Sequence, residues 1–328
     1  MIITRTPLRI TLGGGGTDLP SYYRKAGTGF LVAAAINKYV YIAVNRNFDD
    51  DILLRYSHYE RVPRPEDAQH PLLRECLLCT GVRSTVEVSS MADIPAGTGL
   101  GSSGAFTVGV LKALHAYQHQ NVPNEQLARE ACDIEIDRLR EPVGKQDQYI
   151  AAMGGLSALE FHADERVVVR PVEMADDVRE GIEENLLLFF TGLRRRASEE
   201  LGPQRESSGA VSNAAMDANL DAVRELGYQT HDAMTTGDLP RFGKLLTEQW
   251  QLKLERAPTP VHSRVDGWIR AGVGAGALGG KLVGAGGGGF LLFYAENKAP
   301  LRSAMRDLGL DEVRFAFDGQ GSTILAAS

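Results

Sequence analysis

Cysteine and long apolar runs are scarce in this chain of 328 residues. Three cysteines are too few for a disulfide framework in a chain of this length, so packing must hold the core together, as in a reducing cytoplasm. The longest apolar runs, residues 30–36 and 186–190, fall far short of the ~18 residues that a membrane-spanning helix needs. Arg5 and Arg9 interrupt the place where a secretory signal peptide would carry its apolar segment. We therefore expect a cytoplasmic protein with no membrane partner.

An excess of positive charge is also lacking. The 35 Lys and Arg residues are outnumbered by 42 Asp and Glu residues, for a net charge of −7, which argues against general nucleic-acid binding. The hydrophobic and charged fractions are ordinary for a globular chain, and a length of roughly twice the usual domain size favours two lobes. We place them at residues 1–180 and 181–328. A homo-oligomer is left open.

Glycine is abundant and clustered. The chain has 36 glycines, more than the ~7% of ordinary composition, and half of them lie in residues 13–16, 97–104 and 272–289. Glycine weakens helices and strands, and it permits positive φ angles and close approach of the backbone to a ligand. The pattern predicts three loops lined by backbone.

Strand and helix patterns do not alternate as a doubly wound sheet requires, so we predict an α+β fold with mostly antiparallel sheets. Strands are expected at residues 2–12, 30–36, 38–45, 51–56, 83–91, 156–161, 166–172, 186–190, 290–295 and 312–317, with the second and third paired to each other. Helices are expected at residues 103–120, 124–140, 211–256, 261–271 and 300–308, with Asn124 as an N-cap.

The second glycine cluster allows several interpretations. Residues 99–104 match G-x-G-x-x-G, but the following helix leads into another helix and not into the second strand of a dinucleotide fold. Nor is there a Walker A loop in the third cluster, because Lys281 is followed by Leu282. Residues 94–105 instead place bare amides and two hydroxyls at a helix N-terminus, which suits a polyphosphate, and the Ser103 hydroxyl could reach a bound Mg²⁺. The alternative is a plain turn with Ser103 as the N-cap.

Two acidic residues follow this loop. Glu135 lies on a predicted helix and Asp147 in a short loop containing proline and glycine. A kinase that acts on an alcohol needs one carboxylate near the acceptor hydroxyl and another near the metal. By spacing alone, two ordinary surface carboxylates explain the pattern as well.

Three motifs, taken in order, resemble those of the GHMP kinases. They are TPLRITL at residues 6–12 continuing to Asp18, PAGTGLGSSGA at residues 95–105 and KLVGAGGGGF at residues 281–290. The resemblance implies an N-terminal lobe like ribosomal protein S5 domain 2, a ferredoxin-like C-terminal lobe, and the cofactors ATP and Mg²⁺. It implies that ATP is bound by Pro95, Gly97, Gly99, Leu100, Gly101, Ser102, Ser103 and Gly104.

The same resemblance assigns roles to other residues. Ser103 and Glu135 would hold Mg²⁺, Asp147 would be the catalytic base, and Arg9 beside it would lower its pKa and neutralise charge during transfer. The acceptor would contact the first and third glycine loops. The implied substrate residues there are Gly14, Gly15, Gly16, Thr17, Asp18, Gly286, Gly287 and Gly288.

One departure from the galactokinase motif narrows the range of possible acceptor sugars. Kinases of the galactokinase type carry Glu-His before the Thr-Asp pair, whereas this chain has Gly15 and Gly16 before Thr17 and Asp18, which leaves more room. The run RITLGGGGTDLPSYY resembles D-glycero-D-manno-heptose 7-phosphate kinases, which implies phosphorylation of the anomeric O1 to the 1,7-bisphosphate for GDP-heptose biosynthesis. The alternatives are a fucokinase-like sugar 1-kinase acting on an unphosphorylated sugar, and a non-catalytic nucleotide- or sugar-binding regulator.

A sugar phosphate needs an anion site distant from ATP. Arg194, Arg195 and Arg196 form the densest positive cluster, and guanidinium groups suit phosphate; a solvated loop is the alternative. The C-x-x-C pair Cys76 and Cys79 is interpreted as core packing. His115 and His119 are interpreted as part of a helix face.

Overall fold

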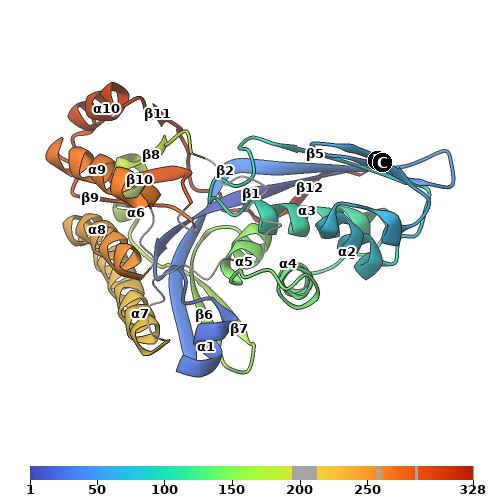
Figure 1. Cartoon of the computed structure of the whole chain (residues 1–328), viewed down its shortest axis with the longest axis horizontal. Helices are drawn as coiled ribbons and strands as arrows, with labels where there is room; N and C mark the ends of the chain where they lie inside the picture. The colour runs from blue at the N-terminus through green and yellow to red at the C-terminus, as the bar shows by residue number, and fades with distance from the viewer. Residues whose placement is uncertain (194–212, 257–259, 285–286, 328) are drawn as a thin grey trace.

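The computed structural model describes residues 1–193, 213–256, 260–284 and 287–327, arranged as two lobes around two sheets (Figure 1). An eight-stranded sheet and the helices between its strands form the larger lobe, and a four-stranded sheet with five helices forms the smaller one within these described residues. None of the helices in these described stretches is both long and apolar enough to cross a bilayer.

Two long strands, β1 (Ile2–Gly13) and β2 (Thr28–Arg46), form the centre of the large sheet. They pair antiparallel from Ile2 opposite Val44 to Gly13 opposite Val32. The prediction that residues 30–36 and 38–45 form two strands paired with each other is wrong, because both belong to β2 and Asn37 between them is part of the strand and not of a turn. The first half of β2 pairs with β6 and the second half with β5, so one strand has different partners at its two ends.

The remaining strands extend the large sheet in the order β12-β1-β2-β5-β3-β4, with β6 beside β2 and β7 beside β6. They are β3 (Ile52–Arg55), β4 (Tyr59–Val62), β5 (Val86–Ala92), β6 (Leu156–His162), β7 (Val167–Pro171) and β12 (Thr323–Ala327). Only β3 and β5 pair parallel among the described strands, which confirms the mostly antiparallel prediction. Strand β12 has no counterpart in the sequence prediction and brings the end of the chain back to β1.

Helices cover one face of this sheet (Figure 1). They are α2 (Pro71–Thr80), α3 (Ser102–Tyr117), α4 (Asn124–Cys132) and α5 (Gln146–Met153), with α1 (Pro20–Ala26) at one end and the short helices η1 (Pro65–Asp67) and η2 (Asp133–Arg138) between them. The predicted helix over 124–140 is α4 followed by the π-helical η2. Asn124 is its first residue and not its N-cap, because Pro123 holds that position and the Asn124 side chain accepts a hydrogen bond from Lys112.

The interpretation of Cys76 and Cys79 as packing and of His115 as part of a helix face is confirmed, whereas that of His119 is wrong, because α3 ends at Tyr117 and His119 has a φ of 61° in the turn that follows. Cys76 is buried and Cys79 half-buried on α2, and both are free thiols. His115 is buried on α3, where its Nε2 lies 2.7 Å from Glu130 Oε2.

The small sheet has the order β11-β8-β10-β9, and its described strands all pair antiparallel. Its strands are β8 (Leu186–Phe190), β9 (Gly279–Leu282), β10 (Phe290–Tyr294) and β11 (Asp311–Glu312), and its helices are α6 (Asp176–Asn185), α7 (Asn213–Thr236), α8 (Leu239–Arg256), α9 (Pro260–Gly274) and α10 (Lys298–Asp307). The single helix predicted over 211–256 is wrong, because Gly237 at φ 78° separates α7 from α8. The strand predicted over 312–317 is also too long, since β11 ends at Glu312.

Several elements join the two lobes. Helix α7 packs against β1 and β2, and Phe317 forms an isolated antiparallel bridge with Ile36. Gln249 on α8 donates from Nε2 to the Leu12 carbonyl oxygen, 3.0 Å away. The division into lobes at residue 180 stays a prediction. One of the contacts between the lobes lies at the end of β1, where the first glycine loop begins.

Candidate active site

Arg9 and Asp147 meet where β1, the second glycine loop and α5 converge. Arg9 Nε lies 2.7 Å from Asp147 Oδ1, and Arg9 Nη1 donates to the Gly99 carbonyl oxygen at 2.7 Å. The Arg9 backbone N–H also donates to the Leu100 carbonyl oxygen at 2.9 Å, so β1 holds the glycine loop at two points. Asp147 lies in the first turn of α5, where the partial positive charge of a helix N-terminus favours a carboxylate.

Two glycines make room for this pair. A Cβ at Gly101 would lie 3.0 Å from Arg9 Cγ and 3.3 Å from Asp147 Cγ, and the φ angle there is 78°. A Cβ at Gly104 would lie only 2.8 Å from Asp147 Cβ. The pair can therefore sit against the first turn of α3 only because both positions lack a side chain.

Asp18 forms the acidic side of the first glycine loop. It is buried, and its carboxylate accepts hydrogen bonds from the Gly16 N–H at 3.1 Å and from the backbone N–H and side-chain Nε2 of Gln146, each at 3.2 Å. Burial raises the pKa of Asp18, and the nearby charge of Asp147 raises it further. A Cβ at Gly144 would lie 1.9 Å from Asp18 Oδ2, so glycine is required beside this carboxylate as well.

Thr17 closes the same loop. Its hydroxyl lies 2.9 Å from the Gly14 carbonyl oxygen and 2.8 Å from the Phe30 carbonyl oxygen, and it accepts a hydrogen bond from the Phe30 N–H. Gly14 has a φ of 78°, and a Cβ there would lie 2.2 Å from the Phe30 carbonyl oxygen. The Thr17 hydroxyl therefore holds the loop against the backbone of β2.

Ser103 and Glu135 also meet, at the N-terminus of α3. Ser103 Oγ donates to Glu135 Oε2 at 2.6 Å, and Gln148 Nε2 donates to Glu135 Oε1 at 3.1 Å. Burial raises the pKa of Glu135 to about 7. The N-cap is Gly101 and not Ser103, so the alternative of Ser103 as a plain cap is wrong, and no side chain caps the helix.

The second and third glycine loops are in backbone contact across the lobes. A Cβ at Gly284 would lie 2.4 Å from Gly99 Cα, and one at Gly289 would lie 2.0 Å from the Thr98 carbonyl oxygen. Gly287 is exposed at this edge, and a Cβ at Gly288 would lie 2.5 Å from Leu193 Cβ. Gly286 and the predicted phosphate-binding residues Arg194, Arg195 and Arg196 lie outside the described residues.

Three basic residues of the smaller lobe were missed by the sequence interpretation. Lys253 and Arg256 lie on α8, and Lys281 on β9 donates from Nζ to the Leu12 carbonyl oxygen at 2.8 Å and to Gln249 Oε1 at 2.9 Å. Lys253 Nζ donates to the Gly284 carbonyl oxygen. Burial lowers the pKa of Lys253 to about 7, with repulsion from Arg256 and Arg9 adding to the effect. The spacing of Gln249, Lys253 and Arg256 along one helix face was the available signal.

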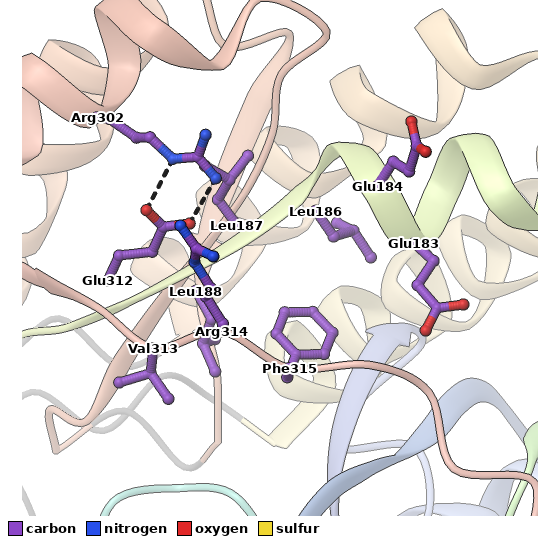
Figure 2. A pocket seen from close by; sticks show the side chains of 10 residues that line it. All are labelled: Glu183, Glu184, Leu186, Leu187, Leu188, Arg302, Glu312, Val313, Arg314 and Phe315. Atoms are coloured by element: carbon purple, nitrogen blue, oxygen red, sulfur yellow. Dashed lines mark hydrogen bonds and ion pairs between the residues drawn. The ribbon is translucent and has the colours of Figure 1, made fainter.

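An open pocket of about 350 Å³ lies elsewhere, between α6, β8, α10 and the segment after β11 (Figure 2). Arg302 donates from Nε and Nη2 to the two Glu312 oxygens, each at 2.8 Å, and these hydrogen bonds lower the pKa of Glu312. Figure 2 shows Glu183 and Glu184 on the other side of the pocket. The pocket shares no lining residue with the cluster around Asp147. Its Arg302 and Glu312 form an ion pair with each other.

In the larger lobe an uncapped helix N-terminus lies beside a carboxylate–arginine pair, and the third glycine loop of the smaller lobe packs against it, an arrangement suited to phosphoryl transfer by a small-molecule kinase. The family descriptions "GHMP kinases N terminal domain" and "GHMP kinases C terminal" match residues 70–155 and 230–310, about half of the chain. The chain belongs to the GHMP kinase family, whose members are ATP-dependent phosphotransferases. The two-lobed α+β fold implied by the sequence resemblance is thereby confirmed.

Individual relatives are similar along nearly the whole length. D-glycero-alpha-D-manno-heptose 7-phosphate kinase of Campylobacter jejuni is 26% identical over 310 residues, covering 90% of this chain and 89% of the relative. The crystal structure of a D-glycero-D-manno-heptose 1-phosphate kinase from Bacteroides thetaiotaomicron has a TM-score of 0.81 at 24% identity, covering all of both chains. Lactococcus lactis galactokinase complexed with galactose has a TM-score of 0.74 at 21% identity, covering 99% of this chain and 95% of the other.

Proposed function

We propose that this kinase transfers the γ-phosphoryl group of ATP to the anomeric O1 of D-glycero-D-manno-heptose 7-phosphate, producing the 1,7-bisphosphate for GDP-heptose biosynthesis. The observation that carries the proposal is the placement of Asp147, paired with Arg9 at 2.7 Å, between the first glycine loop and the N-terminus of α3. The heptose 7-phosphate kinase relative supports the choice of sugar. A cytoplasmic location and a small-molecule partner, without nucleic acid or membrane, belong to the same proposal.

The residues at the N-terminus of α3 fit ATP. The first N–H groups of this helix have no side-chain cap, and Ser102 Oγ is buried with no hydrogen-bond partner among the described residues. Unsatisfied N–H groups and a free hydroxyl at a helix N-terminus suit phosphate oxygens. Residues 95–104 would therefore hold the triphosphate.

The neighbouring oxygens fit Mg²⁺. Ser103 Oγ and Glu135 Oε2 lie 2.6 Å apart, and both are hard donors. Among the described residues, no three His, Cys, Asp or Glu side chains gather into a metal cluster. Two protein oxygens suit Mg²⁺, because this ion usually keeps several waters and takes phosphate oxygens as further ligands. When bound there, it would neutralise charge on the phosphates.

The protein residues have separate duties in the proposed reaction. Asp147 takes the proton of the acceptor hydroxyl while that oxygen forms a bond to the γ-phosphorus and the bond from phosphorus to the ADP oxygen breaks. Arg9 holds Asp147 in position and places a positive charge beside the transferred group. A carboxylate has about four acceptor sites, so Asp18, with three N–H donors bound, keeps one for a sugar hydroxyl.

The test is ADP release with Mg-ATP against a panel of acceptors: D-glycero-D-manno-heptose 7-phosphate, the unphosphorylated heptose, mannose, fucose and galactose. We expect kcat/KM to be at least about 10-fold higher with the 7-phosphate, which corresponds to ~1.4 kcal/mol. Preference for fucose would indicate the fucokinase-like alternative. No ADP release above the rate without acceptor would indicate the non-catalytic regulator.

A further inference from the structure

Helix α8 presents positive charge to the first glycine loop. Lys253 and Arg256 are three residues apart, so they lie on the same side of the helix about one turn from each other. Both side chains are partly buried; Arg256 approaches Gly16 of the larger lobe, and Lys253 donates to the Gly284 carbonyl oxygen of the third glycine loop. Neither has a salt-bridge partner among the described residues.

Arg256 approaches the backbone of the first glycine loop at Gly16. A Cβ at Gly16 would lie 3.3 Å from Arg256 Nη1 and 3.4 Å from Nη2. Arg256 Nη1 is buried and has no hydrogen-bond partner in the part of the chain that the structure describes. Leaving a buried polar group without a hydrogen bond costs about 1–3 kcal/mol, and more for a charged group. An anionic ligand that receives a hydrogen bond from this guanidinium would remove that cost.

The two cations approach different glycine loops. Lys253 donates to the Gly284 carbonyl oxygen, and Gly284 packs on Gly99, whose carbonyl oxygen is bound by Arg9. Arg256 lies about one helical turn further along α8, beside Gly16 of the first glycine loop, the loop that also carries Asp18. Three residues of an α-helix rise about 4.5 Å, so Arg256 lies at the first glycine loop, where the sugar is proposed to bind, while Lys253 lies at the third.

We propose that Arg256, supported by Lys253, binds the phosphate that the sugar already carries and thereby selects phosphorylated sugars over free ones. A guanidinium offers two parallel N–H donors to phosphate, and a neighbouring ammonium adds a point charge. The inference rests on the proposed function, because it concerns the same acceptor. It is separate from the prediction for Arg194, Arg195 and Arg196, and the two are tested side by side.

The first experiment measures KM and kcat of R256Q, R256K and the triple variant R194Q/R195Q/R196Q with the heptose 7-phosphate, the free heptose and ATP. We expect R256Q to raise KM for the 7-phosphate about 10- to 100-fold, because the variant loses a hydrogen bond between two charged groups. It should change kcat/KM for free heptose and KM for ATP less than about 3-fold, and R256K should lie in between. R306Q, an exposed arginine on α10, is the matched control and should behave as wild type.

A second experiment tests the anion site whatever the sugar is. Inorganic phosphate is titrated calorimetrically into wild type and R256Q, each with the ATP site filled by a non-hydrolysable ATP analogue and Mg²⁺. We expect phosphate binding by wild type and at least about 10-fold weaker binding by R256Q, while equal thermal melting of both proteins shows that the variant is folded. This measurement separates failure of the anion site from failure of the heptose proposal, which the acceptor panel reports.

Three outcomes would overturn the inference. One is equal phosphate affinity of wild type and R256Q. Another is a rise in KM for ATP with equal losses of turnover for free and phosphorylated sugar, which would place Arg256 on the transferred phosphate. The third is a rise in KM for the 7-phosphate in the triple arginine variant but not in R256Q.

Discussion

Replacing Gly104 with alanine tests whether the bare first turn of α3 positions Asp147. The new Cβ would lie 2.8 Å from Asp147 Cβ and 3.0 Å from the Gln148 backbone nitrogen, about 0.6 Å closer than ordinary contact, which begins at 3.4 Å. Two of the nearest atoms belong to the α5 backbone, so the clash cannot be relieved by rotating a side chain alone. A misplacement of 1 Å in a catalytic group can cost about 100-fold, so we expect G104A to lower kcat about 10- to 100-fold.

The stability of this variant should change little by comparison. Alanine in a helix gains up to about 1 kcal/mol over glycine, and overpacking costs about 1–3 kcal/mol, so the net loss should be about 0–2 kcal/mol. Gly109 is a matched control on the same helix, because a Cβ there would lie 2.8 Å from Thr6 Oγ1 and 3.3 Å from Ile42 Cγ1, and Asp147 is not among its nearest neighbours. G109A should lose similar stability in urea unfolding and keep wild-type kcat.

The assay is steady-state ADP release for both variants, with ATP binding measured separately by calorimetry. Wild-type kcat in G104A, or an equal loss of kcat in G109A, would refute the argument that the absence of this particular side chain positions the base.

Further predictions concern the base, the metal and a buried ion pair. D147N should lower kcat at least about 100-fold while calorimetry shows unchanged ATP affinity, and full turnover would remove Asp147 from the base role. S103A should raise the Mg²⁺ concentration for half-maximal rate roughly 10-fold, and an unchanged Mg²⁺ dependence would contradict the metal assignment. The hydrogen bond to Glu130 raises the pKa of His115, so the protonated histidine stabilises the fold below pH 6.5 and that stability is lost as pH rises through the raised value. H115Q should therefore destabilise by about 2 kcal/mol at pH 6 and by less at pH 9 in urea unfolding; equal losses would refute the linkage.

What the sequence by itself determined is local. Glycine clusters mark loops because only glycine adopts positive φ freely, and the structure confirms this at Gly14, Gly101 and Gly284. Most strand and helix positions follow from apolar periodicity, as for β1 and α3. The order of motifs was enough to predict the family and to bring Arg9 and Asp147 under one hypothesis before their 2.7 Å contact was known.

The tertiary structure decided which local segments became neighbours. Whether residues 30–45 form a hairpin or a single strand depends on β1, which pairs with both halves of this segment. Strand β12 likewise lies beside β1 although it comes from the other end of the chain. Local patterns carry no information on such pairings, because the pairing free energy comes from the partner strand. Arg256 reached the first glycine loop in the same way, through the packing of one lobe on the other.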